Sequence, residues 1–252
     1  STFPEYQTII FNVDAIRGGN KLKFAIIVFH ELMHLKGHLA FEAEEREFEN
    51  KEGKIKVDVD VSVLRRGLAV KSAQKHREYA QEKHEHFRGL EEAVVSYFEK
   101  NFVQEILSLP IFEKEKEQLT SIGAADLKQK IAESKKINSE DVYWVGESKE
   151  DYAEFSYPHH RKVFNLLINE IKKKFPDKYN SPDEVALEFL RSKFNGKLRD
   201  IAELVEKTFG DLSFRVLGIM NDDENSAINV LEYLRAALRN KNSKERGKYV
   251  KE

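Results

Sequence analysis

The sequence contains no cysteine among its 252 residues, and it has only 2 methionines, 1 tryptophan and 5 prolines. The absence of cysteine excludes disulfide bridges, thiolate metal sites, iron–sulfur clusters and cysteine nucleophiles. It fits a reducing compartment, so we expect a cytoplasmic protein.

Long hydrophobic runs and an excess of positive charge are absent as well. The longest apolar run covers residues 24–29, far short of the roughly 20 residues that a membrane-spanning helix needs. The chain has 42 basic and 44 acidic residues, for a net charge of −2. A phosphate-binding surface is usually strongly basic. We therefore expect neither a membrane nor a nucleic acid as partner.

Aromatic residues are plentiful, with 17 Phe and 9 Tyr, and they supply material for a hydrophobic core. In the first part of the chain, apolar spacing predicts a helix over 21–36 and two strands over 41–49 and 55–63, with a turn at 50–53. It also predicts a helical stretch over 73–108 that is broken near Gly89. In the last part, it predicts helices over 159–175, 183–194, 197–209 and 223–240. Together these patterns predict an α+β fold, with a mixed domain over 1–110 and a mainly helical domain over 111–252.

One motif has the residue types and the spacing of a catalytic metal site. Residues 29–35 read Phe-His-Glu-Leu-Met-His-Leu, which is an H-E-x-x-H pattern on a predicted helix. Residues four apart share a helix face, so His30 and His34 can direct two imidazoles at one ion. Zinc accepts imidazole nitrogen and keeps a position for water. Between the two ligands, Glu31 is placed to act as a general base toward that water.

A hydrolytic zinc site needs a third protein ligand. His38 follows the expected end of the motif helix, and His84 and His86 lie in a charged stretch. Glu91 and Glu92 begin an amphipathic helix, where acidic residues are also favoured by the helix dipole alone. The residues by themselves leave these candidates open.

The motif at 30–34, followed by Gly-Leu-Glu-Glu-Ala at 89–93, resembles the gluzincin clan of zinc metallopeptidases over residues 8–105. The resemblance implies a zincin-like catalytic core and one Zn²⁺ per chain, with a glutamate of the second helix as third ligand. Its register selects Glu92, with Glu91 as the fallback. Many gluzincins carry, four residues later, an aspartate that hydrogen-bonds a ligand histidine. Here that position holds Ser96, a weaker partner.

Two other families with the same short motif fit poorly. Metzincins place a further histidine six residues after the second one, where this chain has Ala40. Peptide deformylases require a cysteine ligand, and the chain has none.

A peptidase also needs a donor that stabilises the developing oxyanion. The resemblance implies a downstream Tyr or His for this role. Residues 155–161 read Phe-Ser-Tyr-Pro-His-His-Arg, and they supply Tyr157, and His160 or its neighbour His159, as candidates.

The sequence thus predicts a zinc-dependent metallopeptidase that acts on a peptide or protein substrate, with Glu31 as base and His30, His34 and Glu92 as metal ligands. The alternative is a zinc-containing regulatory or binding module, or a latent peptidase, whose helical C-terminal half is a partner surface. The presence of Glu31 favours the enzyme, because a structural site needs no base. A structural site would also be closed by a fourth protein ligand.

Overall fold

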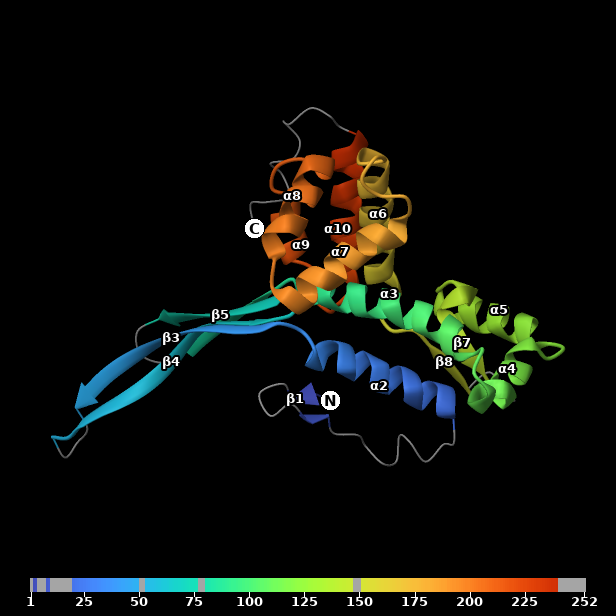
Figure 1. Cartoon of the computed structure of the whole chain (residues 1–252), viewed down its shortest axis with the longest axis horizontal. Helices are drawn as coiled ribbons and strands as arrows, with labels where there is room; N and C mark the ends of the chain where they lie inside the picture. The colour runs from blue at the N-terminus through green and yellow to red at the C-terminus, as the bar shows by residue number, and fades with distance from the viewer. Residues whose placement is uncertain are drawn as a thin grey trace. The chain divides into compact units, whose positions relative to one another are not determined.

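The computed structural model of the chain describes residues 2–3, 8–9, 20–49, 53–76, 80–146 and 151–239. Helices predominate and antiparallel sheets accompany them, so the chain has the α+β character that the sequence predicts (Figure 1). It divides into two compact units: Ser1–Lys36 with Glu92–Asn165, and Gly37–Glu91 with Leu166–Glu252. We call these unit 1 and unit 2. The domain boundary predicted at residue 110 coincides with none of the points where the chain passes from one unit to the other.

Unit 1 contains the motif helix. Its elements are β1 (Thr2–Phe3), β2 (Thr8–Ile9), α2 (Lys21–Leu35), most of α3 (Arg88–Ile106), η2 (Pro110–Phe112), α4 (Glu113–Thr120), α5 (Ala124–Lys135), η3 (Ser139–Asp141), β7 (Val142–Val145), β8 (Tyr152–Glu154) and the start of α6 (Pro158–Lys174). Strands β1 and β2 pair antiparallel, as do β7 and β8. The helices η2, α4 and α5 lie in a charged stretch for which the sequence pattern predicts no element.

Helix α2 is fixed at its start and along its apolar face. The Asn20 side chain caps the helix by accepting a hydrogen bond from the backbone N–H of Lys23 at 2.9 Å. Leu22 and Ile26 are buried in one cluster with side chains of α3. One turn further on, the rings of Phe29 and Phe102 stack with centroids 4.3 Å apart. This packing holds the motif residues of α2 beside α3.

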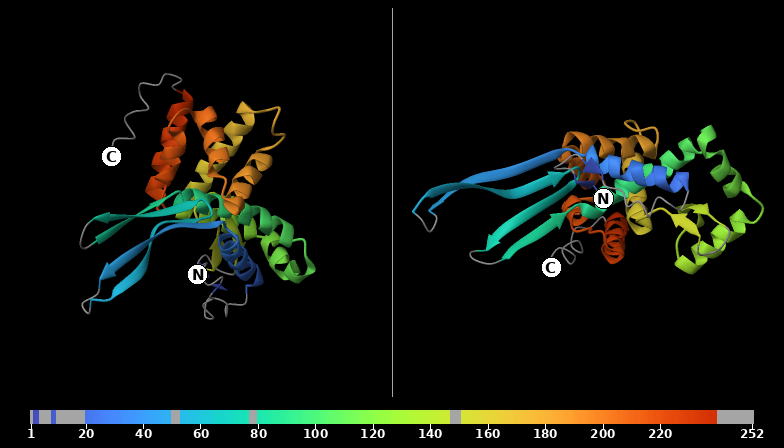
Figure 2. Two further views of the ribbon diagram at one scale, coloured as in Figure 1. Left: turned by 60° about the vertical axis from the view of Figure 1, so that its left-hand side comes forward. Right: turned by 90° about the horizontal axis from the view of Figure 1, so that it is seen from below.

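Unit 2 combines one sheet with a group of helices. Its elements are β3 (Leu39–Glu49), β4 (Ile55–Arg66), β5 (Ala69–His76), β6 (Ala80–His86), the rest of α6, α7 (Pro182–Asn195), α8 (Leu198–Phe209), α9 (Ser213–Gly218) and α10 (Glu224–Arg239). The strands pair antiparallel in the order β3-β4-β5-β6, which Figure 2 shows as four arrows side by side. Buried apolar side chains such as Phe189, Phe209 and Leu234 form the interior of the helical part.

The strands predicted over 41–49 and 55–63 are confirmed as β3 and β4, and both are longer than predicted. Residues 50–52 of the predicted turn lie outside the described part of the chain. The helix predicted over 73–87 is wrong. Residues up to 76 belong to β5, residues 80–86 form β6, and α3 begins at Arg88. The stretch is rich in residues with high helix propensity, but cross-strand pairing decides its conformation.

The predicted C-terminal helices are confirmed as α6, α7, α8 and α10. Proline and glycine mark several of their ends. Pro182 is the first residue of α7, and Gly196 ends it with a positive φ of 79°. The short helix α9 is not predicted by the sequence pattern. Among the described residues, no helix is both long enough and apolar enough to cross a membrane.

Candidate metal centre

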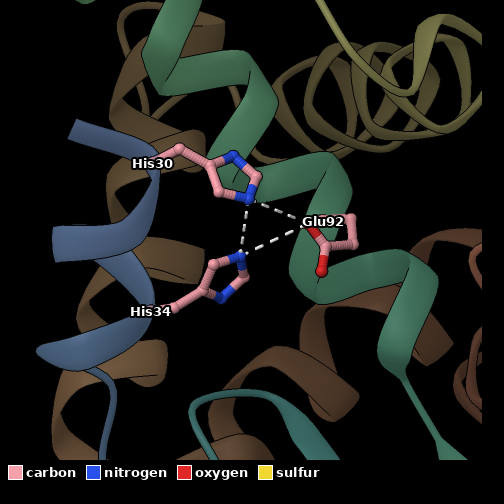
Figure 3. Close-up of side chains that lie close together, drawn as sticks. All are labelled: His30, His34 and Glu92. Atoms are coloured by element: carbon pink, nitrogen blue, oxygen red, sulfur yellow. Dashed lines mark hydrogen bonds and ion pairs between the residues drawn. The ribbon is translucent and has the colours of Figure 1, made fainter. Parts of the chain in front are cut away.

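Two imidazoles and one carboxylate meet between α2 and α3, within unit 1. His30 and His34 lie one turn apart on α2, and their Nε2 atoms are 3.1 Å apart. Glu92 faces both from α3, with its Oε2 atom 3.3 Å from Nε2 of His34 and 3.7 Å from Nε2 of His30. Figure 3 shows the three side chains pointing toward one another. The structure therefore brings together the three residues that the sequence predicts as metal ligands.

The spacing of these atoms fits a tetrahedral zinc ion. Zinc lies about 2.0–2.1 Å from histidine nitrogen and carboxylate oxygen, which gives ligand-to-ligand distances of about 3.3–3.4 Å in a tetrahedron. The three observed distances, 3.1, 3.3 and 3.7 Å, bracket that value. His34 and Glu92 are buried, and His30 is partly buried. Among the described side chains, the group offers three ligand atoms.

Glu99 orients one of the two histidines. Its Oε1 atom lies 2.8 Å from Nδ1 of His30, and the carboxylate is buried. An ionised carboxylate only accepts hydrogen bonds, so in the neutral imidazole Nδ1 carries the proton and Nε2 presents its lone pair. This is the orientation that metal binding at Nε2 requires.

Negative charge surrounds His30. Burial lowers the pKa of His30, but the hydrogen bond with Glu99 and the charges of Glu99, Glu92 and Glu31 outweigh burial and raise that pKa above its ordinary value. The charge of Glu99 also adds to burial in raising the pKa of Tyr143. A site in which several carboxylates surround two imidazoles attracts a cation, whether a proton or a divalent metal.

Glu99 is not predicted from the sequence. The resemblance implies a partner of the ligand histidine at position 96, but Ser96 donates its hydroxyl to the backbone carbonyl of Ser156 at 2.7 Å. Glu99 lies seven residues after Glu92, so both residues share one face of α3. That spacing is readable in the sequence once the third ligand and the helix are known.

Glu91, the fallback ligand, has a different partner in unit 2. Its carboxylate forms a buried ion pair with Lys193 of α7 and accepts the backbone N–H of Leu68 at 2.8 Å. Gly67 has a φ of +60°, and a Cβ there would lie 2.6 Å from Oε2 of Glu91. The two adjacent glutamates of α3 therefore have separate roles, and Glu92 is the one beside the histidines.

The other histidines considered as ligands lie in unit 2. The backbone N–H of His38 donates to the carbonyl of Lys193, and its ring lies against Gly196. His84 and His86 belong to β6, where they are paired with Ser72 and Val70. His38 and His86 do not belong to the ligand group found among the described residues, and the side chain of His84 lies outside the described part of the structure.

The remaining predicted residues lie beside the centre or at the start of α6. Glu31 follows His30 on α2, is half-buried, and its charge acts on His30. Tyr157 and His160 contact each other, with ring centroids 5.2 Å apart in an edge-on arrangement. His160 is buried, and Tyr157 has a φ of +61°. The ligand group itself contains neither of them.

Comparisons with known proteins add no relative. No family model, no curated protein and no solved structure matches the chain.

Proposed function

We propose that the protein is a zinc-dependent metallopeptidase, in which His30, His34 and Glu92 hold the metal. The observation that carries this proposal is the convergence of the three ligand atoms, 3.1, 3.3 and 3.7 Å apart, with Glu31 next to one of the ligands on α2. In this proposal α2 and α3 correspond to the two active-site helices of a zincin-like core. A ligand set of two histidines and one carboxylate, with a fourth position left over, is typical of catalytic rather than structural zinc.

The chemistry divides between the metal and the chain. Zinc, when bound, polarises the substrate carbonyl and lowers the pKa of a coordinated water to about 7. Glu31 accepts the proton of the attacking water while the water oxygen forms a bond to the carbonyl carbon. Glu31 then delivers that proton to the amide nitrogen as the carbon–nitrogen bond breaks. Glu99 keeps the lone pair of His30 directed at the metal throughout.

Tyr157 is the proposed donor to the developing oxyanion. The carbonyl of Ser156, the preceding residue, accepts the hydroxyl of Ser96, which lies one helical turn from Glu92 on α3. The backbone at Tyr157 is thereby held close to the ligand helix. A phenol hydroxyl that is positioned before the reaction stabilises the negative charge without reorganising.

The test is metal content and peptide hydrolysis on the wild type and on Glu31→Gln, measured side by side with quenched fluorogenic peptides. We expect Glu31→Gln to bind zinc as the wild type does and to lose about 10²–10⁴-fold in kcat, the contribution typical of a general base. Glu113→Gln, at an exposed acidic position of α4, is the matched control and is expected to behave as the wild type. Undiminished turnover in Glu31→Gln would contradict the role of Glu31 as general base. Failure of zinc to bind the wild type would contradict the proposed metal centre.

A further inference from the structure

One face of α3 connects the metal centre with the segment before α6. Glu92, Ser96 and Glu99 are spaced four and three residues apart, so they line the same side of the helix. Glu92 belongs to the ligand group and Glu99 contacts His30. Ser96 is buried between them, so whatever Ser96 binds lies on the side of α3 that faces the metal centre.

Ser96 binds the backbone that carries Tyr157. Its hydroxyl donates to the carbonyl of Ser156 at 2.7 Å and accepts a hydrogen bond from Nη1 of Arg161 at 2.5 Å. Arg161 also donates directly to the Ser156 carbonyl. This one carbonyl thus receives two donors, and one of them is cationic. Charge-assisted hydrogen bonds are the stronger and more directional kind.

The guanidinium of Arg161 is itself fixed on its other sides. Nη2 forms an ion pair with Asp141 at 2.8 Å, and both side chains are buried. The guanidinium also lies 5.6 Å from the ring centre of Phe155, whose backbone N–H donates to the carbonyl of Asp141 at 2.8 Å. These contacts hold the guanidinium of Arg161 beside the Ser156 carbonyl.

Tyr157 needs this support. Its φ of +61° is one that a bulky residue adopts only where the surroundings impose it. The carbonyl of Tyr157 accepts the backbone N–H of Arg161 at 3.0 Å, which begins α6, and its ring lies against His160. The strained residue is thus held by Arg161 through the backbone on both of its sides.

We propose that Arg161 is a positioning residue, which acts through Ser96 and the Ser156 carbonyl to hold Tyr157 in the conformation that presents its phenol to the metal centre. This inference rests on the proposed function, because it assigns Tyr157 to that centre. The competing explanation is that the buried Arg161–Asp141 pair serves only the stability of unit 1.

A double-mutant cycle on the zinc-loaded chain of 252 residues separates the two explanations. Arg161→Lys keeps a positive charge for Asp141 but loses the forked geometry of the guanidinium. We expect Tyr157→Phe to lower kcat by about 10²–10³-fold, as for loss of an oxyanion donor. We expect Arg161→Lys to lower kcat by up to about 10²-fold through misplacement, with KM nearly unchanged. The double variant should then be no slower than Tyr157→Phe. Losses that multiply would overturn the proposal.

Two further variants control for stability. Lys100 is another cation near Asp141, with Nζ 3.9 Å from Oδ1 and in a more exposed position. Lys100→Met removes that contact without touching Ser156, so kcat is expected to stay at the wild-type value. If Arg161→Lys does not fold, Ser96→Ala replaces it in the cycle, because Ser96 links Arg161 to the same carbonyl. Coupling between Ser96→Ala and Tyr157→Phe supports the proposal, and independence overturns it.

A measurement that does not depend on turnover distinguishes this inference from the proposed function. Position 157 is labelled with 3-fluorotyrosine, and Co²⁺ is bound in place of zinc. The paramagnetic ion is expected to shift the fluorine resonance, and Arg161→Lys is expected to change that shift, while Lys100→Met leaves it unchanged. A wild type without peptidase activity but with this behaviour would refute only the peptidase. A resonance that is insensitive to Arg161→Lys would refute the positioning role even in an active enzyme.

Discussion

At the scale of single residues, the two adjacent glutamates of α3 show how neighbours in the sequence come to have different partners. Glu92 lies with the histidines, whereas Glu91 pairs with the buried Lys193. Successive residues of a helix point about 100° apart, so neighbours in the sequence reach different surroundings. Removing either carboxylate should therefore produce a different loss.

We expect Glu92→Gln to abolish tight zinc binding at little cost in stability measured without metal. We expect Glu91→Gln to retain zinc but to lower the free energy of unfolding by about 3–5 kcal/mol, because a buried Lys193 charge would lose its counter-ion. Zinc titration and urea denaturation of both variants make the comparison. Zinc loss in Glu91→Gln rather than in Glu92→Gln would move the third ligand to Glu91.

Glu99 is tested by its effect on metal affinity. Glu99→Ala removes the acceptor that orients His30, so zinc affinity is expected to fall about 10–100-fold, as for other groups that hydrogen-bond a ligand histidine. Competition with a chelator of known affinity measures this change. Glu105→Ala, at an exposed site of the same helix, is the control. Equal affinities in the two variants would mean that the contact with Glu99 does not support the site.

At the scale of helices and strands, the elements that the sequence predicts correctly include helices whose ends are marked by local signals. The start of α7 is marked by Ser181, whose hydroxyl accepts the backbone N–H of Glu184 at 3.3 Å, and by Pro182 directly after it. Such signals are local, so the sequence alone can show them. The strands β5 and β6 have no comparable signal, because their conformation comes from pairing with each other and with β4.

The cap of α7 gives a measurable expectation. Ser181→Ala is expected to lower the free energy of unfolding by about 1 kcal/mol. Ser181→Gly is expected to lower it by only a few tenths of a kcal/mol, because glycine is itself favoured at the N-cap. Chemical denaturation of both variants gives the two values. An unchanged free energy of unfolding in Ser181→Ala would show that the hydroxyl does not act as a cap.

The candidate site shows the same division between local and distant information. The placement of His30, Glu31 and His34 on one helix was predictable, because their spacing is itself the signal. The choice of Glu92 needed a resemblance, since a helix start with two glutamates has an ordinary explanation in the helix dipole. Glu99 and the contacts of Ser96 depend on how α2, α3 and the segment before α6 pack, and a single sequence carries no direct record of that packing.

At the scale of the whole molecule, metal binding should appear as stability of unit 1, which contains all three ligands. A ligand present at 100 times its dissociation constant stabilises the native state by about 2.7 kcal/mol. We therefore expect zinc to raise, and a chelator to lower, the melting temperature by several degrees in calorimetry. In His34→Ala the curve should respond to neither addition. A wild type that melts identically with zinc and with chelator would argue against the centre.

The first turns of α3 carry a further consequence for how this protein can change. Substitutions there alter one contact at a time, but an inserted or deleted residue between Glu91 and Glu99 would rotate everything beyond it by about 100°. The residues on the two sides of the change would then no longer face their present partners together, which are the histidines and Ser156 for Glu92, Ser96 and Glu99 and Lys193 for Glu91. Among proteins descended from this chain, this segment should therefore stay constant in length even where single residues are substituted.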